Sequence, residues 1–343
     1  MVLAQGGARG GHLERVGGTE LVVTPGDGVI PFPRVDMNTE EVVDRIRILG
    51  LRNVGCWSLA PDSRLGTSLV ARGFGWGWEP RWMGLDLRHL ARDPPDHQVR
   101  AACAPYADEL PYPPSGPEPV PSLHLGVRSD GLTVGHIVMA PWHGVAGIYS
   151  MGVDPGYRRH GIGRALTIAA CRLAAERGCR YAVLNATDAG EPVYRKVGFE
   201  SLGWGQTWWY VDGPRPSARQ TALAEAIGTG DLDALPALQP TDEELESPLP
   251  GDTSPLRLAL VTDRLETAGW LLERRPGLAS LRFEPFGGTL LHLAVERNKP
   301  AFIELGLAHG VDPRARDGTW NSTGIEWAQH FKNAQIGELL TGR

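Results

Sequence analysis

The sequence predicts an α/β region followed by an all-α segment built from repeated helix pairs. Two observations indicate the α/β region. The apolar, partly β-branched run Val145–Val153 predicts a strand, and apolar residues at helical spacing in Gly163–Arg177 predict a helix. The third observation is the recurrence of similar blocks 35 and 34 residues apart after residue 253, which indicates stacked helical repeats.

The N-terminal part of the chain carries weaker signals. Its first 17 residues are rich in glycine, which predicts disorder. Hydrophobic periodicity in residues 18–95 then predicts two helices and two strands. In chain order these are helix Thr39–Leu49, strand Gly55–Leu59, helix Gly66–Arg72 and strand Trp82–Leu87. The prolines that follow predict a connector over residues 96–121, with room for a helix within Gln98–Leu110.

A glycine-spaced turn between the strand and the helix of the α/β region carries the strongest functional signal. Residues 158–164 read Arg-Arg-His-Gly-Ile-Gly-Arg and lead into the first turn of the predicted helix. Gly161 and Gly163 have no Cβ, so an anion can approach the backbone closely. The first N–H groups of a helix have no partner within it and point outward at the positive end of its dipole. The segment therefore predicts a cradle for a diphosphate.

A second motif follows thirty residues after Gly163. Val193–Phe199 reads Val-Tyr-Arg-Lys-Val-Gly-Phe and comes after a predicted strand at Tyr181–Asn185. Together the two motifs resemble the GNAT superfamily of N-acetyltransferases, over residues 122–212. The resemblance implies a mixed central sheet flanked by helices, acetyl-CoA as the acyl donor, and direct transfer of the acetyl group to an amine.

The resemblance also implies which residues bind the cofactor. The strands Val145–Val153 and Tyr181–Asn185 would splay to admit the pantetheine arm. Backbone groups of Met151 and Val153 would pair with that arm, and the amide of Val153 could polarise the thioester carbonyl. The cofactor-binding residues expected in this way are Met151, Val153, Arg158, Arg159, His160, Gly161, Ile162, Gly163, Arg164 and Asn185. No metal ligands are expected.

Tyr194 is the expected general acid, because a phenol with a pKa of about 10 stays protonated at neutral pH and can protonate a leaving thiolate. The sequence does not identify the general base. In relatives an acidic residue can stand six positions before the residue that matches Val153, and here that position is Gly147. A water relay, a base from the N-terminal half and several nearby polar residues remain open. Those polar residues are His143, Ser150, Asp188 and Glu191.

Tryptophan is dense in the first two segments of the chain. The residues are Trp57, Trp76, Trp78, Trp82, Trp142, Trp204, Trp208 and Trp209. Ordinary core packing explains most of them, and an aromatic-lined acceptor cleft for an apolar or cationic amine is the alternative.

A weak internal repeat relates the N-terminal half to the acetyltransferase-like segment. Leu69–Phe74 matches Tyr194–Phe199 at an offset of 125 residues, and each match follows a predicted strand. Leu69 stands where the second copy has Tyr194, and the first copy has no Arg-x-x-Gly-x-Gly. We therefore interpret residues 18–95 as a degenerate acetyltransferase-like half that does not bind a cofactor diphosphate.

Residues 218–343 resemble ankyrin repeats. Their blocks begin at Ser254, Thr289 and Thr323. With an earlier capping unit near Ala226, these blocks predict about four helix pairs stacked into a solenoid. We expect His292 to hydrogen-bond the turn of its repeat. The Pro-containing break at 213–217 predicts a separately folding module, which would bind a protein partner or mediate self-association.

Composition limits the class of protein. The formal net charge of −6 gives no reason to expect nucleic acid or a membrane as a partner. Four scattered cysteines and an N-terminus without the apolar core of a signal peptide predict a cytoplasmic protein. The leading interpretation is an acetyl-CoA-dependent N-acetyltransferase for a small-molecule or peptide amine of unknown identity. The alternative is a non-catalytic CoA-binding or scaffolding protein that acts through its repeats.

Overall fold

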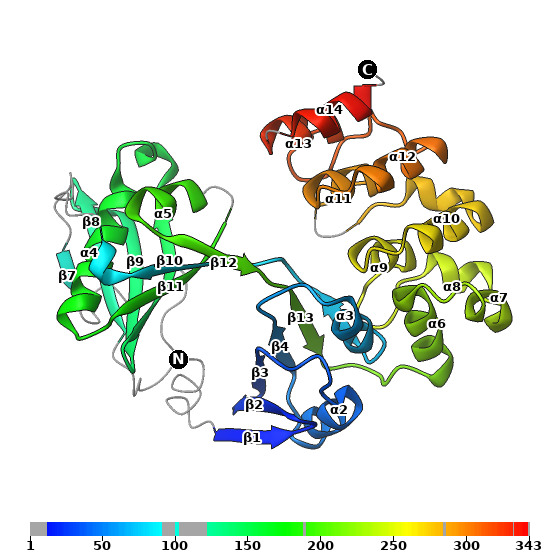
Figure 1. Ribbon diagram of the computed structural model, residues 1–343, viewed down its shortest axis with the longest axis horizontal. Helices are drawn as coiled ribbons and strands as arrows, with labels where there is room; N and C mark the ends of the chain where they lie inside the picture. The colour runs from blue at the N-terminus through cyan, green and yellow to red at the C-terminus, as the bar shows by residue number, and fades with distance from the viewer. Residues whose placement is uncertain are drawn as a thin grey trace. The chain divides into compact units, whose positions relative to one another are not determined.

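Figure 1 shows the helices and strands of the computed structural model. The chain divides into two compact units whose segments alternate along the sequence. Unit 1 contains the described residues up to Met37 together with 44–61 and 77–207, and unit 2 contains 38–43, 62–76 and those from 208 onward. The expected domains were contiguous, whereas each observed unit combines segments that are far apart in the sequence. The structure describes residues 12–90, 100–102, 122–187, 190–283, 286–331 and 333–341.

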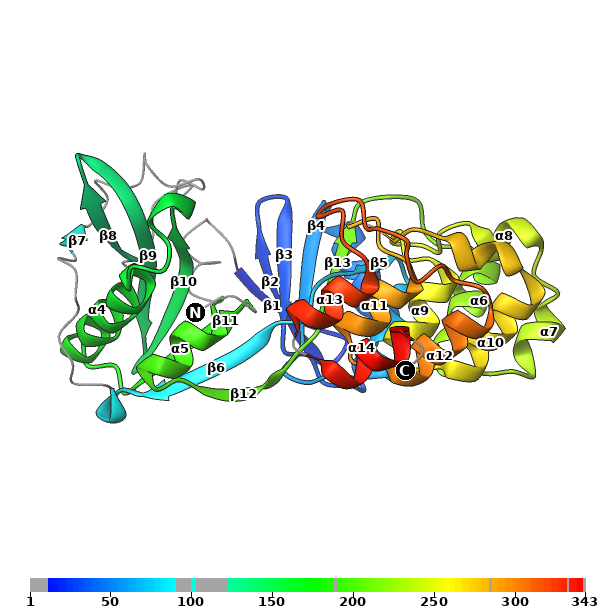
Figure 2. The same ribbon diagram turned by 90° about the horizontal axis from the view of Figure 1, so that it is seen from above.

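A seven-stranded sheet forms the centre of unit 1, in the order β12-β6-β11-β10-β9-β8-β7 (Figure 2). Its strands are β6 (Arg81–Asp86), β7 (Arg100–Ala102), β8 (Leu123–Ser129), β9 (Leu132–Trp142), β10 (Val145–Val153), β11 (Tyr181–Ala186) and β12 (Glu200–Trp204). β10 and β11 are parallel, whereas β6 is antiparallel to both β11 and β12. The sheet is therefore mixed, as expected, and β6 from the N-terminal half completes it.

Helices cover this sheet. α4 (Ile162–Glu176) packs against β8, β9 and β10, and α5 (Glu191–Val197) packs against α4. The expected apolar face of α4 is confirmed, since Leu166, Ala170 and Ala174 are fully buried in the core of unit 1. Two short 3-10 helices, η1 (Leu87–His89) and η3 (Pro155–Tyr157), follow β6 and β10.

Four further strands of unit 1 lie in the order β1-β2-β3-β4. They are β1 (His12–Val16), β2 (Thr19–Thr24), β3 (Asp27–Pro31) and β4 (Asn53–Trp57). β1 corrects the expected disorder for residues 12–16, because its backbone pairs with β2 along its whole length, whereas residues 1–11 lie outside the described residues. The expected helix at Thr39–Leu49 is confirmed as α2 (Thr39–Ile48). The helix expected within Gln98–Leu110 is wrong for residues 100–102, which form β7, and the rest of that span lies outside the described residues.

Unit 2 consists mainly of helices. They are α3 (Ser63–Val70), α6 (Ala218–Thr229), α7 (Ala234–Leu238), α8 (Asp242–Glu246), α9 (Pro255–Val261), α10 (Leu265–Arg274), η4 (Pro276–Ser280), α11 (Leu290–Glu296), α12 (Pro300–Ala308), α13 (Gly324–His330) and α14 (Ala334–Thr341). A short antiparallel pair, β5 (Phe74–Trp76) and β13 (Thr207–Val211), accompanies them. No helix in the described ranges is long and apolar enough to cross a membrane.

Each recurring sequence block begins one helix pair of unit 2. Ser254, Thr289 and Thr323 are the N-caps of α9, α11 and α13, where a hydroxyl oxygen can accept a bond from the first helical turn. α9, α11 and α13 pair with α10, α12 and α14, and successive pairs contact one another. His292 accepts from the Thr289 amide (Nδ1–N 3.0 Å) and bonds the Ser322 carbonyl (Nε2–O 2.9 Å), so its expected structural role is confirmed.

The break at 213–217 does not separate two folding units. α6, which follows the break, packs against α3, which precedes it by about 150 residues. The Thr221 hydroxyl donates to the Ala71 carbonyl (3.1 Å), and the Arg72 guanidinium pairs with Glu225 (3.0 Å). Both contacts lie within unit 2, so the expectation of a separable C-terminal module needs this correction.

A pair of glycine substitutions tests the packing of α6 on α3. A Cβ at Gly228 in α6 would lie 2.4 Å from Thr67 Oγ1 in α3, whereas a Cβ at Gly337 in α14 would meet nothing within 4 Å. We expect Gly228→Ala to lower the free energy of unfolding by about 1–3 kcal/mol through overpacking. The matched control Gly337→Ala should raise it by roughly 0.5–1 kcal/mol. Denaturant unfolding measures both, and equal effects would contradict the described junction.

Candidate active site

The parallel strands β10 and β11 separate part of the way along their length. Their pairing runs from Val145–Tyr181 to Ile148–Leu184 and ends there, although β10 continues for five residues more. The expected splay of these two strands is therefore confirmed. It leaves the second half of β10 without β11 as a hydrogen-bonding neighbour.

A bulge in β10 accompanies the splay. Tyr149 lies opposite Val138 of β9 and Gly152 lies opposite His136, so β10 has one residue more than β9 over this stretch. Ser150, within the bulge, adopts a φ of 46°, in the left-handed region that few non-glycine residues occupy. Because the bulge adds one residue, the N–H and C=O groups that follow it point to the opposite edge of β10 from the one they would face in a regular strand.

The backbone of Val153 faces the gap between the splayed strands. The next amide, that of Asp154, donates to the Val134 carbonyl of β9 (2.9 Å). Because successive amides of a strand point to opposite edges, the N–H of Val153 points away from β9. The Val153 carbonyl accepts a hydrogen bond from Arg158 Nε (3.1 Å), which draws the glycine-spaced turn toward this end of β10.

The glycine-spaced turn caps α4 with a bare backbone. Gly161 is the N-cap of α4 with a φ of 80°, and it supplies no side-chain hydrogen bond to the first turn. Arg159 also has a positive φ, of 68°. Both residues are exposed, as are Arg158 and His160. A Cβ at Gly163 would stand 3.6 Å from Met151 Cε, an ordinary contact, so the protein interior itself does not require glycine there.

Tyr194 lies on α5 and is buried in the core of unit 1, where only 6% of its surface is exposed. Its ring meets Phe199 edge to face at 5.9 Å between centroids. Burial disfavours the charged phenolate and raises the pKa of Tyr194 to about 12. The phenol is therefore protonated at neutral pH, as a general acid must be.

The polar residues that the sequence left open as general bases differ in their surroundings. Glu191 is hydrogen-bonded to Arg81 (2.9 Å) and Arg195 (2.8 Å). Burial opposes ionisation of Glu191, but these hydrogen bonds outweigh it and lower its pKa, so the carboxylate is ionised and occupied. His143 lies in the turn before β10, so it is at the other end of this strand from Val153, and it packs on Trp142. Asp188 lies outside the described residues, and Ser150 faces the cavity described below.

Sequence reasoning missed His136. This residue lies on β9 opposite the bulge, and a Cβ at Gly152 would stand 2.7 Å from its ring. Burial, together with His124, lowers the pKa of His136, which favours the neutral imidazole. Nothing local in the sequence could indicate it, because only the pairing of β9 with β10 brings it to the bulge. Among the described residues, no group of three or more His, Cys, Asp or Glu side chains could hold a metal ion.

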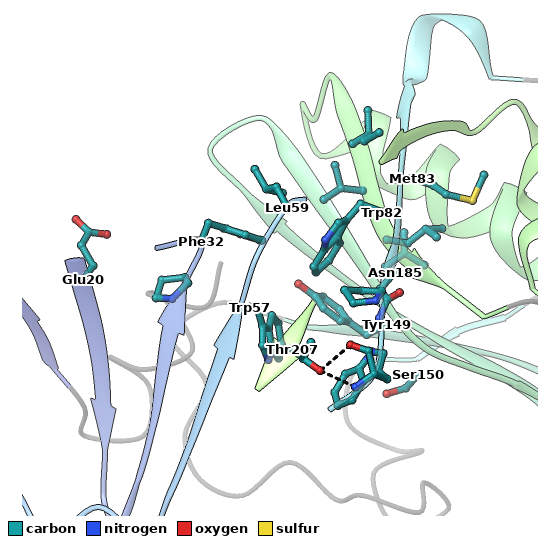
Figure 3. Close-up of a pocket in the computed structure, with 17 residues that line it drawn as sticks. Glu20, Phe32, Trp57, Leu59, Trp82, Met83, Tyr149, Ser150, Asn185 and Thr207 are labelled. Atoms are coloured by element: carbon teal, nitrogen blue, oxygen red, sulfur yellow. Dashed lines mark hydrogen bonds between the residues drawn. The ribbon is translucent and has the colours of Figure 1, made fainter. Parts of the chain in front are cut away.

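A cavity of about 660 Å³ lies in unit 1 beside the splayed strands (Figure 3). Ser150 of β10 and Asn185 of β11 form one end of its lining, and Glu20 of β2 lies at the other end in Figure 3. Its aromatic lining residues are Phe32, Trp57, Trp78, Trp82 and Tyr149. Three of the eight tryptophans, Trp57, Trp78 and Trp82, line this cavity, as the alternative of an aromatic cleft requires.

Other tryptophans serve packing or lie on the surface. Trp76 and Trp208 meet edge to face in the core of unit 2, at 5.6 Å between ring centroids. Trp142 and Trp204 are exposed, and Arg81 stacks over the Trp204 ring. Sequence reasoning missed Glu20 of β2 and Phe32, just after β3, as lining residues, because long-range packing brings both segments to the cavity.

Residues 85–199 match the sequence model of the Acetyltransferase (GNAT) family. Over 49 residues the chain is 37% identical to glucosamine 6-phosphate N-acetyltransferase of Trypanosoma brucei brucei, a stretch that spans 14% of this chain and 33% of that protein. Similar solved structures include GCN5-related N-acetyltransferases from Kribbella flavida and Sphaerobacter thermophilus. The first is 19% identical with a TM-score of 0.47, over 62% of this chain and 95% of its own. The second is 17% identical with a TM-score of 0.40, over 62% and 91%.

The segment from residue 85 to residue 199 is therefore an acetyltransferase domain of the GNAT family. This identification rests on the family model. The chain spans about a third of the length of the curated relative it matches. The matched segment contains the splayed strands, the glycine-spaced turn and Tyr194.

Tyrosine ionisation tests the burial of Tyr194. Its folded-state pKa of about 12 lies above the ordinary value of 10.0, and Tyr149 behaves in the same way. Their contribution to stability should therefore be complete below pH 10 and be lost as the pH rises toward 12, since ionisation favours the unfolded chain. Tyrosinate absorbance, followed with circular dichroism, should show Tyr194→Phe removing one tyrosine from the highest-pH step. If Tyr194→Phe instead removes a tyrosine that ionises near pH 10, the described burial is contradicted.

Proposed function

We propose that the protein is an acetyl-CoA-dependent N-acetyltransferase that transfers the acetyl group directly to an amine. The observation that carries this proposal is the position of the glycine-capped N-terminus of α4 next to the splay of β10 and β11, within the segment that matches the family. A thiol-release assay with acetyl-CoA and a panel of amines tests it. Amine-dependent release is expected, and its absence across the panel would refute the activity.

The residues present fit acetyl-CoA. The bare first turn of α4 offers N–H groups and the positive end of a helix dipole, which suit the diphosphate. Around that turn, Ile162 and Gly163 contribute backbone, and Arg158, Arg159, His160 and Arg164 contribute positive charge and donors. The gap beyond Ile148 and Leu184 would take the pantetheine arm, with Met151, Val153 and Asn185 along it. When bound, acetyl-CoA supplies an activated acyl group as a thioester.

The chain's own groups would position the reactants and move protons. The N–H of Val153 faces the gap, where it can stabilise negative charge on a carbonyl oxygen. Tyr194 keeps its phenolic proton through neutral pH and can donate it from its hydroxyl oxygen. For removal of a proton from the amine, the candidates are a water relay, Ser150 at the cavity, a base from the N-terminal half, and the neutral His136 opposite the bulge.

A second function has a specific observation in its favour. Tyr194 is 6% exposed and lies in the core of the domain, outside the lining of the cavity. The strand position that can carry a carboxylate in relatives is occupied by Gly147, which is buried. These features favour a domain that binds CoA without catalysis and acts through the helices of unit 2. Turnover of acetyl-CoA separates the two functions.

The remaining parts of the chain receive the following proposed roles. We interpret the strands and helices of residues 18–95 as a degenerate acetyltransferase-like half, since they end in β6, which completes the catalytic sheet. We interpret the stacked helix pairs of residues 218–343 as ankyrin repeats that bind a protein partner or mediate self-association. The protein would work in the cytoplasm.

Substitution at Gly161 tests the proposed diphosphate cradle. Asp and Asn tolerate the positive φ of this position about equally, so Gly161→Asn controls for backbone strain and added bulk. Gly161→Asp adds a negative charge beside the proposed diphosphate and should weaken acetyl-CoA binding about tenfold or more relative to Gly161→Asn. Calorimetry measures both affinities. Equal affinities in two folded variants would place the diphosphate elsewhere.

Removal of the Tyr194 hydroxyl tests its role as the acid. Tyr194→Phe keeps the buried ring, so acetyl-CoA affinity should be little changed while kcat falls on the order of 10- to 10⁴-fold. The matched control is Tyr181→Phe, at an exposed tyrosine where β11 begins, and it should keep kcat. A normal kcat in Tyr194→Phe would leave Tyr194 a packing residue.

A further inference from the structure

The lining of the cavity has no cationic side chain. None of its 17 residues, all of them described, is a lysine, an arginine or a histidine. Glu20 is its one carboxylate and lies 3.7 Å from the guanidinium of Arg15, which is outside the lining. Tyr149, Ser150, Asn185 and Thr207 carry its other polar side-chain groups apart from the indole N–H groups. The Thr207 hydroxyl is already engaged with the Trp78 backbone (2.8 and 2.9 Å). A phosphate or carboxylate on a ligand would therefore lose its water here without gaining a cationic partner.

Large apolar side chains that water reaches gather at the same cavity. Phe32, Trp78, Leu59 and Leu202 all line it, and they are 44%, 48%, 57% and 63% exposed. When a ligand covers apolar side chains that are exposed to water, the burial is favourable and stabilises the complex. The cavity is therefore suited to a ligand with a substantial apolar surface.

The aromatic wall of the cavity is held in place before any ligand binds. The indole N–H of Trp82 donates to the Ser58 carbonyl (3.0 Å), which fixes the orientation of the ring. Phe32 meets Trp82 edge to face at 5.6 Å, and Trp57 lies 6.4 Å from it. Phe32 has a φ of 50°, a costly conformation that its amide helps to maintain by donating to the Trp57 carbonyl (2.8 Å). A preformed wall of this kind selects its ligand by shape and apolar surface.

The two ends of the cavity differ. Ser150 and Asn185 stand where β10 and β11 splay, next to the proposed path of the acetyl group. The rings extend from there toward Glu20, as Figure 3 shows. An acceptor would thus place its nitrogen at the Asn185 end and its apolar body along Phe32, Trp57 and Trp82.

We propose that the acceptor is a primary amine carried on a bulky aromatic or aliphatic group, without phosphate or carboxylate. This inference rests on the proposed acetyltransferase function, and it separates this chain from the sugar phosphate that the name of its trypanosomal relative indicates. In the transfer, a C–N bond forms at the amine and the C–S bond of the thioester breaks. One proton leaves the nitrogen and one reaches the thiol, so the reaction balances without another reagent.

Matched amines test the proposal on the full-length protein with acetyl-CoA. Because 2-phenylethylamine carries a ring, its kcat/KM should be about tenfold or more above that of ethylamine. Tyramine should exceed O-phosphotyramine by about tenfold or more, because only the phosphate differs. Glucosamine 6-phosphate should be a poor acceptor. Preference for glucosamine 6-phosphate, or for O-phosphotyramine over tyramine, would overturn the proposal and leave the acetyltransferase function standing.

A pair of leucine variants places the acceptor in the cavity. Leu202→Ala removes an apolar lining residue on β12 and should lower kcat/KM for 2-phenylethylamine several-fold, on the order of 3- to 30-fold. Leu132→Ala, at a similarly exposed leucine on β9 outside the lining, should change it by less than about twofold. Equal effects of the two substitutions would overturn the cavity assignment.

Binding without turnover distinguishes failure of this proposal from failure of the proposed function. Trp57, Trp78 and Trp82 line the cavity, so 2-phenylethylamine should change tryptophan fluorescence saturably, more weakly in Leu202→Ala and normally in Leu132→Ala. If that binding occurs but no amine is acetylated, the ligand class is supported and the transferase function is overturned. If amines are acetylated but 2-phenylethylamine neither binds nor reacts, the ligand class is overturned alone.

Discussion

The separation of β10 from β11 is the constraint on which the rest of the site depends. The two strands pair for four residues and then diverge, while the bulge at Ser150 adds a residue to β10. A paired β11 would occupy the edge of β10 that Val153 presents to the gap. The same separation opens the side of the cavity lined by Ser150 and Asn185. One irregularity in the sheet therefore serves both reactants of the proposed transfer.

The N-terminal half contributes a strand of the sheet and aromatic side chains to this site. β6 lies between β11 and β12 and is antiparallel to each, so the seven-stranded sheet is incomplete without it. The cavity is also lined by Phe32, which directly follows β3, and by Trp57 of β4. A half that lacks the glycine-spaced turn would thus contribute strand and aromatic surface in place of cofactor contacts.

The sequence predicted local elements well and long-range ones poorly. Val145–Val153 matches β10 at both ends, and the predicted helix Gly163–Arg177 differs from α4 by one residue at each end. Hydrophobic periodicity and capping residues are local, so they report such elements directly. The insertion of β6, the contact of α6 with α3 and the position of Glu20 depend on packing between distant segments. No window of the sequence contains that information.

Hydrogen exchange at the amide of Val153, with and without acetyl-CoA, tests the central claim most directly. In the described geometry this N–H faces the gap, whereas the amide of Asp154 is bonded to the Val134 carbonyl. The account predicts that acetyl-CoA slows exchange at Val153 markedly and leaves exchange at Asp154 nearly unchanged. Unchanged exchange at Val153 while acetyl-CoA is bound would show that the cofactor does not enter the gap between β10 and β11, and would contradict the account.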